Sequence, residues 1–324
     1  MPLLRAHPLL GFVLRRIGLG VLTLFLVSVL VFAATEALPG NAARAVLGRT
    51  ATPAALAALE KKLHLDQPVW KQYEMWLGGV VSGNPGKSLV NGEPVLQEVM
   101  PRIRNSAVLL ILAGIFGVPI ALFAGIIAAI RRDGRFDAAV STTALGLAAL
   151  PEFVVGMFLV ILLATTVLRW LPPVSLVPPG TDVLTRPRIL VLPVLTLMLV
   201  IFPYIFRMMR GSMAEILESD YIEMARLKGI GQRRLIFLHA LPNAIAPVIQ
   251  VVALTFAYLA GGVVLVEYVF AYHGIGQGLI DAIFARDIPV IQFEVVVLAG
   301  FYVALNILAD LLAVLTTPRL RDAG

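Results

Sequence analysis

Long stretches of apolar residues without a charged side chain constrain this chain more than any other feature. Several runs exceed about 18 residues, which is enough for an α-helix to cross a bilayer core about 30 Å thick. Only 14% of the residues are charged, whereas a soluble chain carries about 25%. We therefore expect an all-α integral membrane protein, with a single transmembrane domain over residues 1–324.

The apolar runs and their polar borders predict six transmembrane helices, with proline and glycine marking several of the ends. Pro151 interrupts the third span, because proline cannot continue a helix regularly. The spans are expected at residues 9–35, 105–130, 138–168, 189–206, 244–266 and 291–315, with a large external region at 36–104 and a cytoplasmic loop at 207–243.

Basic residues gather on one side of the predicted spans and so set the orientation, because loops rich in arginine and lysine stay in the cytoplasm. The two short external loops hold only four arginines. Many more lie in the segments expected in the cytoplasm, including Arg15, Arg16, Arg131, Arg132, Arg135, Arg207, Arg210, Arg226, Lys228, Arg233 and Arg234. Both termini are therefore expected in the cytoplasm, and the net charge of +6 reflects orientation rather than nucleic-acid binding.

The first apolar run is too long for a signal peptide and lacks a small-residue cleavage site, so no cleavable signal is expected. The external region that follows predicts two helices of its own. One runs from Pro53 to about Leu63, and the next carries Trp70, Tyr73 and Trp76 on roughly one face. These rings either rest at the membrane interface or pack against the rest of the region.

Charged residues at membrane depth are costly and often functional. Glu152 follows Pro151, and it either lines a water-filled path that favours a substrate ammonium or is satisfied inside the bundle. Glu267 is a candidate gate residue, or a docking residue for a binding protein, at the external mouth. Glu294 is expected to snorkel outward, and Asp310 to cap or pair locally.

Other kinds of site are not indicated. The chain has no cysteine, and its four histidines lack metal-ligand spacing. No Ser/His/Asp set suggests hydrolysis, so we expect no catalytic, cofactor-binding or metal-binding residues and no enzymatic activity.

The polar stretch from Asp220 to Pro247 predicts a helix–turn–helix at the membrane surface. Asp220 and Glu223 have the spacing of a capping box for a first helix over residues 221–228. That helix is expected to stop at Gly229 or Gly231, where a left-handed residue favours glycine. A second helix is expected over residues 233–241, followed by a break at Pro242.

This stretch resembles the cytoplasmic coupling loop of bacterial ABC-importer permeases. That loop reads Glu-Ala-Ala, three residues, Gly, nine residues, Ile, one residue, Leu-Pro. Two positions depart, with Met224 for an Ala and His239 for the Ile, and His239 is similar to the dipeptide/oligopeptide branch. The resemblance implies that the ATPase is contacted through Glu223, Ala225, Gly229, His239, Leu241 and Pro242.

The resemblance also implies the partners. This permease in the bacterial plasma membrane would pair with a second permease subunit, expected to be a different, homologous chain. Two cytoplasmic ATPase subunits would hold ATP and Mg, and an extracytoplasmic binding protein would deliver peptides. Membrane lipid is the other contact, and no nucleic acid is expected.

Two alternatives remain. A secondary transporter of small solutes would be expected to show internal repeats, which are not evident here. Importers with the same ABC fold also carry glutathione or nickel, and the residues of this chain do not indicate which of these substrates it transports.

Overall fold

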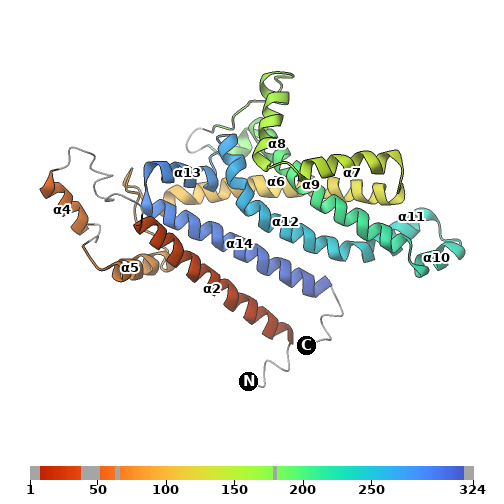
Figure 1. The fold of residues 1–324 in the computed structure, drawn as a ribbon, viewed down its shortest axis with the longest axis horizontal. Coiled ribbons are helices and arrows are strands. Elements are labelled where there is room, and N and C mark those ends of the chain that lie inside the picture. The colour runs from red at the N-terminus through yellow and green to blue at the C-terminus, as the bar shows by residue number, and fades with distance from the viewer. Residues whose placement is uncertain (1–7, 38–51, 63–65, 178–180, 317–324) are drawn as a thin grey trace.

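The computed structural model describes residues 8–37, 52–62, 66–177 and 181–316, and the structural statements that follow concern this part of the chain. It is helical, with one isolated antiparallel bridge between Lys87 and Pro94 and no strand in the described residues. Five described helices are long and apolar enough to cross a membrane. They are α2 (Pro8–Glu36), α6 (Val95–Ile130), α9 (Pro187–Leu217), α12 (Leu241–Val269) and α14 (Ile288–Thr316) (Figure 1).

The helices extend beyond the apolar stretches that predict them. Helix α6 begins at Val95, directly after Pro94, and so before the expected span at 105–130. Helix α9 continues to Leu217, well beyond residue 206, so residues 207–217 are helix and not loop. Apolar sequence marks the part of a helix suited to lipid, whereas the backbone continues until a residue such as proline or a cap ends it.

The third apolar segment is broken, as Pro151 predicts. Helix α7 (Arg135–Ala148) stops before the proline and α8 (Glu152–Val160) starts after it, with an angle of 109° between them. Helix α8 continues as the short π-helical turn η1 (Ile161–Thr165). Glu152 therefore stands at the turn, in the first turn of α8.

Helices α6 and α9 form the tightest pair in the bundle. Small residues recur at every fourth position on the buried face of α6: Ala113, Gly117, Ala121, Gly125 and Ala129. Helix α9 opposes them with a fully buried row of the same period: Leu197, Ile201, Ile205, Met209 and Met213. Small residues let helix backbones approach closely, which is how membrane helices gain packing contacts.

Gly125 shows how close the two helices are. A Cβ at this position would lie 2.8 Å from the Cβ of Met209 and 2.9 Å from the backbone oxygen of Phe206. Real Cβ atoms essentially never come this near to other heavy atoms, so glycine is required here by space rather than by backbone conformation.

Helices α12, α14 and α2 complete the bundle in that order from α9 (Figure 1). Helix α2 is joined to α14 near both ends, by a 2.7 Å hydrogen bond from Gln292 to Thr35 and by a 3.0 Å ion pair between Arg16 and Asp310. The expectation that Asp310 pairs locally is therefore confirmed.

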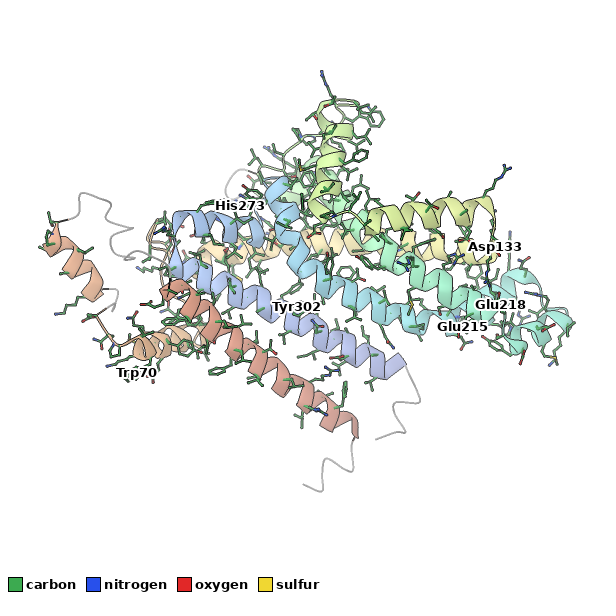
Figure 2. The ribbon with its side chains drawn as sticks, in the orientation of Figure 1. Trp70, Asp133, Glu215, Glu218, His273 and Tyr302 are labelled. Carbon is green, nitrogen blue, oxygen red and sulfur yellow. The ribbon has the colours of Figure 1, made fainter. Side chains whose placement is uncertain are left out.

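The region between α2 and α6 contains α4 (Pro53–Lys62) and α5 (Val69–Val81), near the predicted positions. The aromatic side chains of α5 divide between two environments. Tyr73 and Trp76 pack against Phe32 of α2, with ring centroids 5.3 and 5.7 Å from it, and the Tyr73 hydroxyl bonds that of Ser28 at 2.8 Å. Trp70 is 66% exposed and points away from the bundle (Figure 2).

Replacing Gly125 by valine should therefore separate α6 from α9. We expect the stability of the purified permease to fall by about 1–3 kcal/mol, because overpacking forces backbone shifts. Thermal unfolding in detergent is the measurement. Gly146→Val is the control, because Gly146 lies on α7 with no atom near its Cβ position. Equal unfolding temperatures for the two variants would contradict the tight α6–α9 contact.

Candidate coupling surface and translocation face

The polar loop after α9 folds into a short helix, α10 (Asp220–Leu227). Its N-cap is Ser219, and no side chain hydrogen-bonds the cap, so the predicted Asp220–Glu223 capping box is wrong. The actual start is one residue earlier, which places Asp220 inside the first turn. The predicted stop is confirmed, because the chain leaves α10 through Gly229 at φ +76°.

The second helix of the loop does not break at Pro242. A single turn, α11 (Gln232–Arg234), leads into the π-helical segment η3 (Leu235–Ala240), which runs directly into α12. The predicted break is therefore wrong. Pro242 lies in the first turn of α12, where a missing N–H is tolerated, and π-helical spacing offers a further way to accommodate a proline.

One face of this loop is buried against the bundle. Ile222 of α10 and Leu235, Ile236 and Ala240 of η3 are buried. Tyr221 and Asn243 connect the two helices, since Asn243 Nδ2 donates to the Tyr221 hydroxyl at 3.2 Å and to the His239 carbonyl at 2.8 Å. The loop is thus a packed structure attached to α12.

The loop also presents large apolar side chains to the surroundings. We define the coupling surface as exposed Glu223 together with the exposed residues Tyr221, Met224, Leu227, Phe237 and Leu238. Exposed apolar clusters of this kind mark protein-interaction sites. Sequence reasoning singled out Glu223 but missed the apolar members, although Leu227, Phe237 and Leu238 are large apolar residues in a polar loop.

The structure places the other residues of the predicted coupling motif around this surface. Gly229 and Pro242 are exposed, whereas Ala225, His239 and Leu241 are half-buried. The His239 side chain is not needed for the contacts with Tyr221 and Asn243, which use its backbone oxygen.

Ion pairs connect the loop end of α9 to the broken segment. Arg210 binds Asp137 of α7 through two hydrogen bonds, of 2.5 Å from Nε and 2.6 Å from a terminal nitrogen. Arg132 pairs with Glu218, at the end of the bundle where Asp133 also lies (Figure 2). A shift of α10 would therefore be transmitted to α7 as well as to α9.

Glu152 lies where α8 meets α9 and α12. Its carboxylate approaches α12 so closely that a Cβ on Gly262 would lie 3.3 Å from the Glu152 Oε1 atom. Tyr258 of α12 lies near this carboxylate, and the centroid of the Tyr258 ring lies 6.4 Å from that of Tyr204. Two aromatic hydroxyls and one carboxylate thus gather near the middle of α9 and α12, which we call the tyrosine–glutamate cluster.

Glu267 is fully buried at the end of α12, where it caps the next helix, α13 (Ile275–Ala285). Its carboxylate accepts hydrogen bonds from the Ser106 hydroxyl at 2.5 Å and from the Gly276 N–H at 2.7 Å. A carboxylate suits the first turn of a helix because the N–H groups there have no helical partner. Gly274 is required beside it, because a Cβ there would lie 2.2 Å from Glu267 Oε1.

Glu294 does not snorkel outward, which corrects the expectation for this residue. It is fully buried, and neither carboxylate oxygen has a hydrogen-bond partner among the described residues. Gly278 of α13 leaves room for both Glu294 and Arg102, since a Cβ there would lie 2.5 Å from Glu294 Oε1 and 2.3 Å from an Arg102 nitrogen. Arg102 pairs instead with Glu98, at 3.3 Å. The fold of α13 onto the bundle, rather than lipid depth, decides the position of Glu294.

The turn between α12 and α13 is also tightly packed. Tyr272 is fully buried, and its hydroxyl donates to the Asn105 carbonyl at 2.9 Å. Burial, with the negative charge of Glu267 adding to it, raises the pKa of Tyr272, so the phenol stays protonated. Burial lowers the pKa of His273, which keeps this imidazole neutral at neutral pH.

No set of three or more His, Cys, Asp or Glu side chains in the described part of the chain is placed to hold a metal ion. The arrangement instead gives two functional features. One is an exposed apolar surface on a loop between two long helices, and the other is a polar cluster on a helix-rich apolar bundle. The long apolar helices describe a multi-pass membrane protein.

Comparison with known proteins agrees with this class. Residues 121–322 match the family described as binding-protein-dependent transport system inner membrane component. Residues 9–110 match the family of the N-terminal part of such membrane components. The chain therefore belongs to the binding-protein-dependent transport system inner membrane component family.

Relatives of known name cover nearly the whole chain. A probable peptide ABC transporter permease protein of Sinorhizobium fredii is 37% identical over 311 residues, or 96% of this chain and 99% of the relative. A dipeptide transport system permease protein of Alkalihalophilus pseudofirmus is 33% identical over 97% of this chain and 100% of its own length. A glutathione transport system permease protein of Shigella flexneri is 34% identical, with 97% and 99% covered.

The cap on α13 predicts a specific effect of Glu267→Gln. Glutamine keeps one acceptor oxygen, so at least one of the bonds from Ser106 and Gly276 is lost, at a cost of about 1–3 kcal/mol. We expect the amide of Gly276 to exchange with deuterium at least about tenfold faster. Glu74→Gln on exposed α5 is the control. Unchanged protection of α13 in Glu267→Gln would show that the cap does not hold the helix.

Proposed function

We propose that this chain is the membrane-spanning permease subunit of an ATP-driven importer for peptides. Membership of the family and the names of the similar permeases support this function. The observation that carries it is the coupling surface, because an importer permease must present a protein-binding face to its ATPase. The surface stands on a packed loop between α9 and α12, and movement there reaches two long helices together.

The proposed assembly contains a second, homologous permease, two cytoplasmic ATPase subunits and an extracytoplasmic binding protein. ATP and Mg belong to the ATPase subunits. The coupling residues on this chain are Glu223, Ala225, Gly229, His239, Leu241 and Pro242, and the apolar members of the coupling surface extend them. A closure of the ATPases would move α10 and so reorient α9 and α12, which gives the two arrangements that coupling requires.

Orientation follows from the charges. Arg131 and Arg132 lie in the α6–α7 turn and Arg135 begins α7, at the bundle end that also carries α10 and its basic residues. We propose that this end faces the cytoplasm of a bacterial plasma membrane. Helix α13 and its Glu267 cap then lie on the external side, where Glu267 would act on gating through the position of α13.

Glutathione is a second candidate substrate, favoured by the similar glutathione permease of Shigella flexneri. Glutathione is itself a tripeptide derivative with a free ammonium group and so shares chemistry with short peptides. Uptake by the complete transporter of a labelled dipeptide, with and without excess glutathione, separates the two substrates.

The proposed orientation is tested by reporter fusions. Fusions at Asp133 and Lys228 should report the cytoplasm, and fusions at Lys71 and Asp182 the external side, because basic loops are retained inside. Alkaline phosphatase and fluorescent-protein activities are the measurements. An external Lys228 would remove the argument that an ATPase meets this loop.

Gly229→Val and Glu223→Arg test the coupling surface. Valine at φ +76° is strained by about 1–3 kcal/mol and should reorient the turn after α10. Glu223 is exposed and caps nothing, so arginine there should leave the fold intact and weaken only a contact with a basic ATPase residue. We expect both variants to lower ATPase co-purification, or to uncouple hydrolysis from transport.

The matched controls lie close by. Gly231 has φ −62° and open space around it, so Gly231→Val should couple normally. Glu215 is an exposed acid on α9, so Glu215→Arg controls for a change of charge (Figure 2). If Gly229→Val and Glu223→Arg behave like these controls in both assays, the loop is not the coupling site.

A further inference from the structure

The tyrosine–glutamate cluster combines polar groups that are not expected on a surface that faces lipid. Tyr204 is 44% exposed near the middle of α9, and Tyr258 is 52% exposed near the middle of α12. Glu152 is half-buried at the break between α7 and α8. Polar groups at membrane depth face a bundle interior or a water-filled path rather than hydrocarbon. The face that carries the cluster is therefore not a lipid face.

The chemistry of the cluster favours a cationic ligand. A carboxylate accepts charge-assisted hydrogen bonds, and tyrosine rings attract a cation held over their faces. No lysine or arginine forms an ion pair with Glu152 among the residues that the structure describes. Tyr258 lies near the carboxylate, and a neutral phenol does not neutralise its charge. The cluster thus presents one negative charge beside two exposed aromatic rings.

The packing around Glu152 also determines where its side chain can lie. Gly262 on α12 leaves room for the carboxylate, since a Cβ there would lie 3.3 Å from Oε1 and 3.6 Å from Cδ. Pro151 ends the preceding segment and turns the chain by 109°, which brings the side chain to α12 instead of continuing along α7. In secondary transporters, discontinuous helices form the substrate site.

We propose that Glu152, Tyr258 and Tyr204 form a subsite on the translocation path that binds a primary ammonium group of the substrate. The proposal rests on the proposed import of peptides, which carry such a group at the amino terminus or on a lysine side chain. Glu152 pairs with the ammonium, and Tyr258 and Tyr204 supply ring faces. The remainder of the substrate would be held by the opposing permease.

The absence of cysteine from the sequence allows a direct test in the complete transporter. A single Tyr204→Cys substitution places a thiol beside the cluster. Cationic and anionic methanethiosulfonate reagents are applied from water, and modification of this chain is followed by mass spectrometry. We expect the cationic reagent to react about tenfold faster, relative to its reaction with free cysteine, because a carboxylate concentrates cations locally. Glu152→Gln should abolish this preference.

The control thiol is placed on the other side of the bundle. Tyr302 is 50% exposed on α14, away from α8 (Figure 2). Its cysteine variant should show no charge preference that depends on Glu152. If the thiol at position 204 is unreactive toward both reagents, or if its preference survives Glu152→Gln, the cluster does not line a water-filled cationic path and the proposal is overturned.

Substrate protection then identifies the ligand. Alanyl-alanine at saturating concentration should slow modification at position 204, and N-acetyl-alanyl-alanine should not. Protection by N-acetyl-lysyl-alanine would assign a lysine ammonium as a further source, and its absence would assign the amino terminus alone. Equal protection by all three peptides, or by none, would overturn the subsite.

Two further readouts separate this proposal from the function on which it rests. Peptide uptake by the wild-type transporter with its binding protein and ATP tests import, and its absence would count against the import of peptides whatever the labelling shows. Co-purification of the second permease with Glu152→Gln tests the competing role of Glu152 as an interface ion pair. Loss of that partner would overturn the subsite and assign Glu152 to the interface.

Discussion

The close approach of α6 and α9 is the contact on which the rest of the bundle depends. Lipid is as apolar as leucine, so helices in a membrane gain little from hiding apolar side chains and must gain from packing instead. Ala113, Gly117, Ala121, Gly125 and Ala129 remove side-chain bulk from one face of α6 at every fourth residue. The large side chains of α9 fill that space, and α12 and α14 then build outward from α9.

This packing also determines which helices would move together. Helix α9 is held against α6 along its length, yet it ends beside the loop that carries the coupling surface. Arg210 and Asp137 couple α9 to α7, and the break at Pro151 separates α7 from α8. A displacement of α10 would act on α9 and, through the Arg210–Asp137 ion pair, on α7, and packed helices with ion pairs of this kind can carry coupling between distant parts of a protein.

Local sequence signals were reliable where the chemistry is local. The prolines placed the break before α8 and the starts of α4 and α5, and Gly229 adopted the left-handed conformation expected of a helix stop. The predicted capping box failed because the helix began at Ser219, one residue earlier than Asp220 suggested. The predicted break at Pro242 failed because the π-helical segment η3 runs directly into α12 and the helix continues past the proline. The capping error concerns one residue at a helix end, where boundaries shift readily by one or two residues.

The sequence by itself determined the helical membrane character, the positions of the apolar segments and the family to which the chain belongs, because these depend on hydrophobicity, charge and short motifs. The small residues at every fourth position of α6 are also visible in the sequence. They indicate a packing partner only once the structure places α9 opposite them. Tertiary structure alone decided the environments of the acidic residues. Glu267 and Glu294 both lie in apolar segments, yet one caps α13 and the other is buried without a hydrogen-bond partner among the described residues. Glu152 meets Tyr258, a residue more than a hundred positions away, through helix packing. A side chain's partners depend on which helices come together, and no local pattern records that.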